Sequence, residues 1–435
     1  MVTTGLYVRA AIVMVMVTVA AAAPAQQAGP AAAPIPVREV TAPVATDSGM
    51  LRSATHVRGL SDGRVVVNDG TRRRLVLFDA TLKAMTILAD TAAGAAKPYG
   101  TRAALIAFTG DSTLLVDFDA QALVVIDPAG RFGRVMAPPK PTDLRFFSSS
   151  AYGVPGFDPK GRLVYRALRP PAAGGSLEGG VLPDGANKPV FTRIGSDSAP
   201  IVRSDFDSRE IDTVALMRLP VSMSMTISPQ VGRMVGVGVY NPLPVTDEWT
   251  LLPDGTIAVV RAQDYHIDWW DMGGKMTSTP KMPFDWKRIS SEEKQALIDS
   301  LKHADSTRRA NTPPPPPPPP GSPTPIYLPF TAVDAADLPD YYPPIRSGQV
   351  KSDREGNVWI LPSTSSLSQG NLLGPLTNPT SGLVFDVVNR KGEIVERVKL
   401  PPGRNLAGFG PDATVYMIYA PAPGVIYLER ARVAR

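Results

Sequence analysis

The sequence of 435 residues contains no cysteine and only three histidines, His56, His266 and His303. Without thiols the chain can form no disulfide, thiolate zinc site or iron–sulfur cluster, and it has no cysteine nucleophile. Three histidines spread along the chain also disfavour a histidine-rich metal site. Apolar residues make up 43% of the chain and charged residues 20%. That balance is sufficient for a buried core and excludes wholesale disorder.

Neither positive nor negative charges are in large excess. The net charge is only +5, and the only consecutive arginines are those at 72–74 and 308–309. A nucleic-acid interface needs a concentrated basic face, so we expect no nucleic-acid partner.

No apolar run is long enough to span a bilayer. The longest, from Ala10 to Ala23, has 14 residues, fewer than the ~20 that a membrane helix needs. Arg9 precedes this run and Ala23-Pro24-Ala25 ends it, which is the pattern of a signal peptide with a small-x-small cleavage site. We therefore expect residues 1–25 to be a signal peptide. The mature protein should then be periplasmic or secreted and carry no transmembrane anchor.

A polar turn followed by an apolar strand recurs six times. In its clearest copy, Asp62-Gly63 precedes an apolar strand at 65–69 and a second strand at 74–79. Asp-Gly pairs suit tight turns, because glycine tolerates positive φ and aspartate bonds to its own backbone. The last turn residues of the six copies are 63, 112, 161, 255, 356 and 413. The first two spacings are both 49 residues, which is near the length of a four-stranded unit, and the longer spacings contain insertions.

This repeat predicts an all-β fold, a six-bladed β-propeller over residues 34–435. The apolar strands need both faces covered, and radially stacked four-stranded sheets cover them. A β-sandwich or an open array of hairpins is the alternative, although a sandwich rarely gives six equivalent turns. The lone strand at 36–40 has no partner upstream, so we expect it to pair with the C-terminal blade and close the ring.

The repeated units resemble a known repeat family. The segments 62–69 and 353–360 resemble NHL-type repeats, and the chain is similar to exported bacterial six-bladed β-propeller proteins of the NHL-repeat-like superfamily. The resemblance covers residues 36–435. It implies the fold and says little about function, because this fold hosts many activities.

Three insertions interrupt the predicted ring, at 168–200, 284–346 and 363–382. In the second, Ser290 and Glu293 form a capping-box pattern, which predicts a short amphipathic helix over 291–304 that packs on the propeller. Eight prolines at 313–320 follow and favour polyproline II, as a linker or as an exposed ligand for an aromatic groove.

Motifs of catalytic type occur only in unsuitable places. The G-x-S-x-G pattern at 59–63 and the Gly-Asp-Ser at 110–112 lie in blade turns, and the S-x-x-K at 291–294 starts the surface helix. Four aspartates could be compared with the calcium ligands of lactonase-like propellers: Asp69, Asp117, Asp268 and Asp353. We expect them instead to cap turns or form ion pairs within a blade, and we expect no metal or cofactor.

The remaining candidates are positional, because ligands of propellers usually bind at one mouth of the central channel. Five residues lie just ahead of the predicted innermost strands: Arg52, Arg102, Tyr152, Trp249 and Arg346. Together they would suit an anionic or planar ligand through bidentate hydrogen bonds and stacking. The alternative is that they form ordinary contacts at the blade edges.

The sequence thus favours a monomeric binding or scaffold propeller without catalysis. Its partner would be a protein, a peptide, an envelope component or a small anionic ligand. The alternative is a propeller enzyme, either a calcium-dependent hydrolase of lactones or esters or a lyase.

Overall fold

The computed structural model describes residues 34–91, 97–149, 152–168, 197–219, 223–228, 233–311, 331–365, 382–422 and 424–434. The expected signal peptide at 1–25 and the prolines at 313–320 lie outside these residues, as does most of the insertions at 168–200 and 363–382. The chain divides into two units, 1–34 and 35–435, and the second is the subject below. Among the described helices, none combines the length and apolar character that crossing a bilayer requires.

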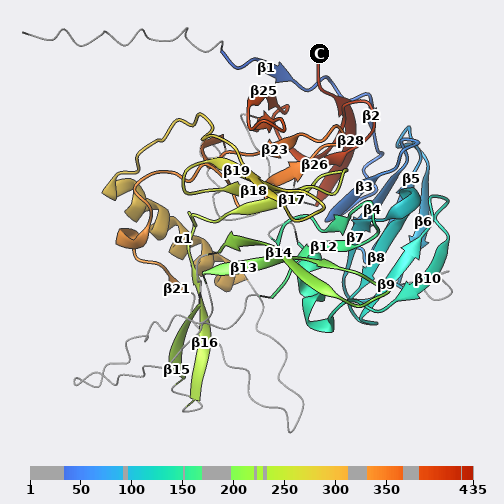
Figure 1. Cartoon of the computed structure of the whole chain (residues 1–435), viewed down its shortest axis with the longest axis horizontal. Helices are drawn as coiled ribbons and strands as arrows, with labels where there is room; N and C mark the ends of the chain where they lie inside the picture. The colour runs from blue at the N-terminus through green and yellow to red at the C-terminus, as the bar shows by residue number, and fades with distance from the viewer. Residues whose placement is uncertain are drawn as a thin grey trace, which may run out of the picture. The chain divides into compact units, whose positions relative to one another are not determined.

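Six sheets follow one another along the chain as the blades of a propeller (Figure 1). Each contains four antiparallel strands, and the sheet of the fifth blade has β1 as an additional fifth strand. The first three blades consist of β3 (His56–Gly59), β4 (Val65–Asp69), β5 (Arg74–Phe78) and β6 (Met85–Ala89); β7 (Ala103–Ala107), β8 (Thr113–Asp117), β9 (Ala122–Ile126) and β10 (Phe132–Met136); and β11 (Gly156–Phe157), β12 (Leu163–Arg166), β13 (Ser198–Ser204) and β14 (Ile211–Arg218). The others are β17 (Glu248–Leu251), β18 (Ile257–Arg261), β19 (His266–Trp270) and β20 (Met276–Ser278); β22 (Val350–Ser352), β23 (Val358–Ile360), β24 (Val384–Val388) and β25 (Ile394–Lys399); and β26 (Arg404–Phe409), β27 (Thr414–Ala422), β28 (Val425–Arg432) and β2 (Ala45–Thr46). The predicted six-bladed all-β fold is confirmed.

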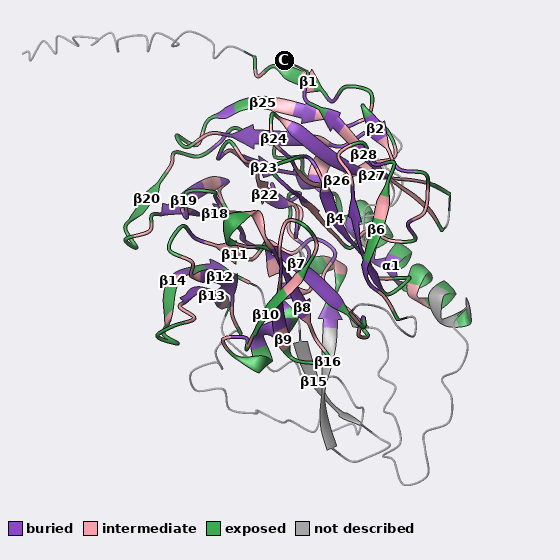
Figure 2. Ribbon diagram, turned by 90° about the vertical axis from the view of Figure 1, so that its right-hand side faces the viewer, coloured by how far each residue is buried: buried purple, intermediate pink, exposed green. Residues whose placement is uncertain are grey.

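Burial follows the position of each strand in its blade. Every residue of β4 and β5 is buried, whereas all three residues of β20 are exposed at the rim (Figure 2). Apolar side chains fill the spaces between blades; Trp359 of the fifth blade, for example, packs edge-on against Phe409 of the sixth with ring centroids 5.0 Å apart. The β-branched strands therefore form cores between neighbouring sheets, as expected when both faces are covered.

The repeated turn joins the innermost strand of each blade to the next strand. Gly63, Gly161, Gly255 and Gly356 all have positive φ there, which is the conformation that favours glycine. In the sixth blade Asp412 and Ala413 adopt the same conformation without glycine.

The N-terminal segment does complete the last blade, through a strand slightly downstream of the expected one. β2 pairs antiparallel with β28 as the fourth strand of the sixth blade. The expected segment, 36–40, forms β1 (Val37–Glu39), which pairs in parallel with β25 of the fifth blade. Val40 then bridges to Val433, so this segment links the last two blades.

The insertion before the fifth blade contains the predicted helix. Its capping box is present, because the Ser290 amide donates to Glu293 Oε2 at 2.8 Å and the Glu293 amide donates to Ser290 Oγ at 3.1 Å. The helix α1 (Ser291–Asn311) is longer than expected. It packs mainly on the returning part of its own insertion, where Ile298 and Leu301 bury against Leu338.

A small three-stranded sheet was not foreseen. β15 (Met223–Ser228) and β16 (Arg233–Tyr240) form a hairpin between the third and fourth blades, and β21 (Thr331–Ala332) adds to it in parallel. The hairpin and the helical insertion thus join through one strand pair.

Candidate functional site

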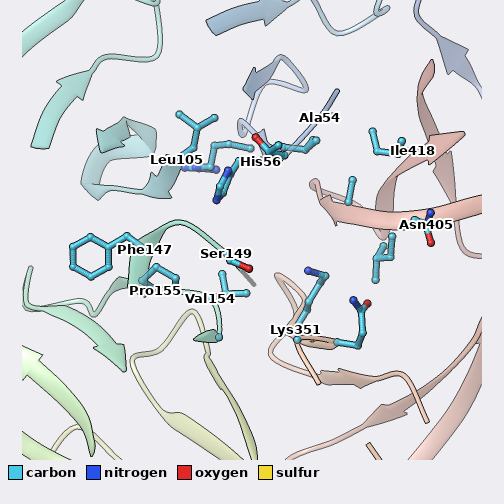
Figure 3. Close-up of a pocket in the computed structure, with 18 of the residues that line it drawn as sticks. Ala54, His56, Leu105, Phe147, Ser149, Val154, Pro155, Lys351, Asn405 and Ile418 are labelled. Atoms are coloured by element: carbon cyan, nitrogen blue, oxygen red, sulfur yellow. The ribbon is translucent and has the colours of Figure 1, made fainter. Parts of the chain in front are cut away.

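A cavity of about 690 Å³ lies where the innermost strands of the blades converge (Figure 3). Its walls come from β3, β7, β22 and β26, and from the segments that lead into β11 and β22. Apolar side chains make one part of the wall: Val57, Leu105, Phe147, Val154, Pro155, Leu406 and Ile418. The polar part contains His56, Arg58, Arg346, Gln349, Lys351 and Asn405.

The charges around this cavity are all of one sign. Arg58, Arg346 and Lys351 contribute basic groups, and no aspartate or glutamate is among the described residues that line it. Arg58 is partly compensated, because its Nη2 pairs with Asp111 Oδ1 at 3.2 Å. Burial is the largest influence on Arg346 and lowers the pKa of its guanidinium. An anion in the cavity would relieve this cost.

Lys351 enters the cavity from β22. Among the described residues, none forms a hydrogen bond or an ion pair with its ammonium group. Burial lowers the pKa of Lys351, and the nearby carboxylate of Glu248 partly opposes that shift. The charge of Lys351 is therefore poorly solvated.

Glu248 lies behind the wall of the cavity, at the start of β17. Its Oε1 accepts hydrogen bonds of 2.9 Å from the hydroxyl group of Ser347 and from the amide of Gly348. Burial raises the pKa of Glu248 to about 7. These hydrogen bonds and the Arg166 guanidinium act in the opposite direction, but their effect on the pKa is smaller. The segment ahead of β22 thus covers the Glu248 carboxyl group, whose charge acts on Lys351.

His56 projects into the cavity from β3, on the side opposite Lys351 (Figure 3). Its Nδ1 is buried and has no hydrogen-bond partner among the described residues. Burial and the charge of Lys351 lower the pKa of His56 to about 4. The imidazole is therefore neutral at pH 7.

A second cavity of about 620 Å³ adjoins the first on the side of the repeated turns. The two share Arg58 and Lys351 among their lining residues. Asp111 at this end accepts hydrogen bonds of 2.7 Å from the amide and the hydroxyl group of Ser61, the serine of the G-x-S-x-G pattern. Ser61 thus lies in a blade turn and caps a neighbouring turn, as the repeat predicts.

Of the five residues predicted at the channel mouth, Arg346 lines the cavity and the other four are placed elsewhere. Trp249 is fully buried between the third and fourth blades, where its indole N–H donates to the Tyr152 carbonyl at 3.0 Å. Tyr152 itself stacks on the Arg166 guanidinium, 4.6 Å from the ring centroid. Arg52 and Arg102 are exposed, and they contact the Gly424 carbonyl and the Phe118 ring respectively. The set therefore does not surround one mouth, although ligand binding by each residue stays a prediction.

The four aspartates compared with calcium ligands all have bonds within their blades or turns. Asp69 pairs with Arg74 at 3.2 Å, and Asp268 pairs with Arg261 at 2.7 Å. Asp353 accepts from the Asn357 amide at 2.7 Å, and Asp117 accepts from the Ala120 amide at 3.0 Å. Within the described part of the chain, no group of three or more His, Cys, Asp or Glu side chains is arranged to hold a metal ion.

The residues that sequence reasoning missed share a position in the repeat. The residues seven places before the six turn positions are His56, Leu105, Val154, Glu248, Gln349 and Leu406. All but Glu248 line the cavity. Two places later, Arg58, Ala107 and Lys351 line it as well, as the two-residue period of a strand requires. Counting back from the turns by a fixed number would therefore have found the site.

The sequence matches no protein-family model and no curated protein. The structure is similar to a member of the DUF4221 family from Bacteroides vulgatus, with 12% identity, a TM-score of 0.45, and coverage of 92% of this chain and 99% of that one. It is also similar to a gluconolactonase from Xanthomonas campestris (10% identity, TM-score 0.37, 88% of each chain). A third similar structure is virginiamycin B lyase from Staphylococcus aureus (10% identity, TM-score 0.36, 87% of this chain and 94% of that one). Similarity at this level assigns no activity to the chain, whose fold is established by its own strand order.

Proposed function

We propose that this protein is a binding propeller whose central cavity takes a small organic anion. The observation that carries the proposal is the wall of the cavity, which contains Arg58, Arg346 and Lys351 and no acidic side chain among the described residues. The volume of about 690 Å³ lies within the range of small-molecule pockets.

The individual side chains suit a carboxylate or a phosphate group. Arg346 offers a planar donor fork, and Lys351 offers a cation with no protein partner among the described residues. Gln349 and Asn405 add amide groups near them, while Leu105, Val154 and Leu406 provide an apolar surface for the body of the ligand. Such a mixture of a few polar groups on an apolar wall is usual in ligand pockets.

Calorimetric titration with a panel of small carboxylates and phosphate esters, each beside its uncharged amide or alcohol, tests the proposal. We expect binding of at least one anion and weaker binding at high salt. Lys351→Met and Arg346→Gln should each weaken binding by about tenfold or more. Arg52→Gln and Arg102→Gln are matched controls outside the cavity and should leave binding unchanged. Equal binding of the charged and uncharged partners would contradict the proposal.

The enzyme alternative, calcium-dependent hydrolysis of a lactone or ester or a lyase reaction, has no comparable support from the described residues. Elemental analysis of the purified protein for calcium, with turnover that is lost in chelator, would favour it over binding alone. Export to the periplasm or beyond, a monomeric state and a macromolecular partner stay predictions.

A further inference from the structure

The most unusual group in the cavity is the amine of Lys351. It stands in a cavity whose other charged lining residues are Arg58 and Arg346, and no described residue forms a hydrogen bond or an ion pair with it. A desolvated lysine loses its proton more readily, and its neutral form is a nucleophile. Burial lowers the pKa of Lys351, and the carboxylate of Glu248 partly opposes this shift.

The groups that face this amine are suited to covalent chemistry. His56 projects into the cavity from the opposite side (Figure 3), and its imidazole is neutral at pH 7 because burial lowers its pKa to about 4. Leu105, Val154 and Pro155 add apolar surface to the wall of the cavity.

We propose that Lys351 forms an imine with the carbonyl carbon of a small oxo acid bound in the cavity, while Arg346 pairs with the carboxylate of that acid. The inference rests on the proposed anion site and deepens it, because it names the class of ligand. A simple carboxylate would bind there without reacting. An oxo acid carries both the anion for the arginine and the electrophile for the lysine.

The reaction balances without any oxidant or reductant. The lone pair of the neutral Nζ attacks the carbonyl carbon, so a C–N bond forms and the carbonyl π electrons move to oxygen. The nitrogen loses a proton and the oxygen gains one, which gives a carbinolamine. A second proton, taken up from solvent water, reaches the hydroxyl group. The C–O bond then breaks, water leaves, and the nitrogen lone pair forms the C=N bond of the protonated imine. His56 is the neutral titratable group that faces Lys351 and can carry the proton from nitrogen to oxygen.

Reductive trapping tests the inference on the full mature chain. Pyruvate is added with borohydride, and the modified lysine is located by peptide mapping and mass spectrometry. We expect the reduced adduct at Lys351 to exceed that at the exposed Lys275 by about tenfold or more. Lys351→Arg should abolish the adduct, because a guanidinium group does not form the imine. Arg346→Gln should reduce trapping by pyruvate, because the carboxylate loses its partner.

Lactate separates this inference from the proposed function, because it has the same carboxylate and no carbonyl group. If calorimetry shows binding of both acids but pyruvate labels Lys351 no more than Lys275, the imine is overturned and the anion site stands. If acetone labels Lys351 as efficiently as pyruvate and calorimetry shows no binding of lactate to the wild-type protein, the reactive lysine stands and the anion site fails. Absence of both binding and labelling would overturn both.

Discussion

The hydroxyl group of Ser347 donates a hydrogen bond of 2.9 Å to Oε1 of Glu248, across the boundary between the fourth and fifth blades. The Gly348 amide donates to the same oxygen at 2.9 Å. These bonds hold a buried carboxyl group next to the innermost strand that carries Lys351. The buried Glu248 carboxyl group and the strand that contributes Lys351 to the cavity are therefore linked by these hydrogen bonds.

Glu248 should make the protein less stable as the pH rises. Burial raises its pKa from the usual 4.5 to about 7, so between these values the folded state holds a proton that the unfolded state releases. The contribution of Glu248 protonation to the unfolding free energy is then fully present at pH 4.5 and is lost as the pH rises through 7. The loss is at most about 3 kcal/mol. Glu248→Gln should remove this loss, so that the unfolding free energy of the variant gains on the wild type from pH 4.5 to 7. Urea unfolding at several pH values measures the unfolding free energy of both proteins, and Glu393→Gln at an exposed position is the control. If the unfolding free energies of the wild type and Glu248→Gln depend on pH in the same way, the prediction is wrong.

His56 should make the protein less stable as the pH falls, which is opposite to the effect of Glu248 and covers almost the same pH range. Its pKa is lowered from 6.5 to about 4, so between these values the unfolded state binds the extra proton. The contribution of the neutral His56 to the unfolding free energy is fully present above pH 6.5 and is lost as the pH falls toward 4. The loss is again at most about 3 kcal/mol. The unfolding free energy of His56→Gln should therefore increase relative to that of the wild type as the pH falls. Nitrogen-15 NMR of the imidazoles provides a direct check, since a His56 ring that titrates between pH 6 and 7 would refute the prediction.

The sequence predicts the ring better than the site because the two depend on different information. The Asp-Gly turns and β-branched strands are local signals, and they located all six innermost strands. The five predicted mouth residues were chosen by their position just ahead of each expected innermost strand, and they lie at unequal distances from the turns. A strand rotates its side chains by half a turn per residue, so an offset of one residue placed Trp249 in the core between blades.

Other features required knowledge of the partner strands. Glu248 occupies the same repeat position as His56, yet the segment ahead of β22 covers it. The sequence around Glu248 does not indicate that the segment with Gly348, about a hundred residues later in the chain, covers it. The parallel pairing of β1 with β25 and of β21 with β16 is likewise set by tertiary contacts, and the lone strand at 36–40 could only be predicted to pair somewhere near the C-terminus.

Gly153 should tolerate no side chain, because of its position against Trp249. Its φ is +86°, and an added Cβ would lie well inside van der Waals contact with the indole nitrogen. Gly161 has a similar φ of +77° but open space around it. Gly161→Ala should therefore cost only the backbone strain, about 1 kcal/mol, while Gly153→Ala should cost at least about 2 kcal/mol more. Thermal and chemical unfolding compare the two variants, and equal losses would show that the contact with Trp249 relaxes freely.

The closure of the ring should depend on β2 far more than on β1. A chain that begins at residue 40 lacks β1, whose three residues pair with β25 near an exposed Val37. A chain that begins at residue 49 also lacks β2 and the buried Asp47, whose carboxylate accepts the Leu428 amide at 2.7 Å. That second truncation leaves the edge of β28 unpaired, and an open edge both destabilises a blade and invites association between chains. We expect the first truncation to lower the thermal midpoint by a few degrees and the second by about 10 °C or more, with higher oligomers of the second in size-exclusion chromatography. Similar midpoints for both truncations would mean that the sixth blade is stable with three strands.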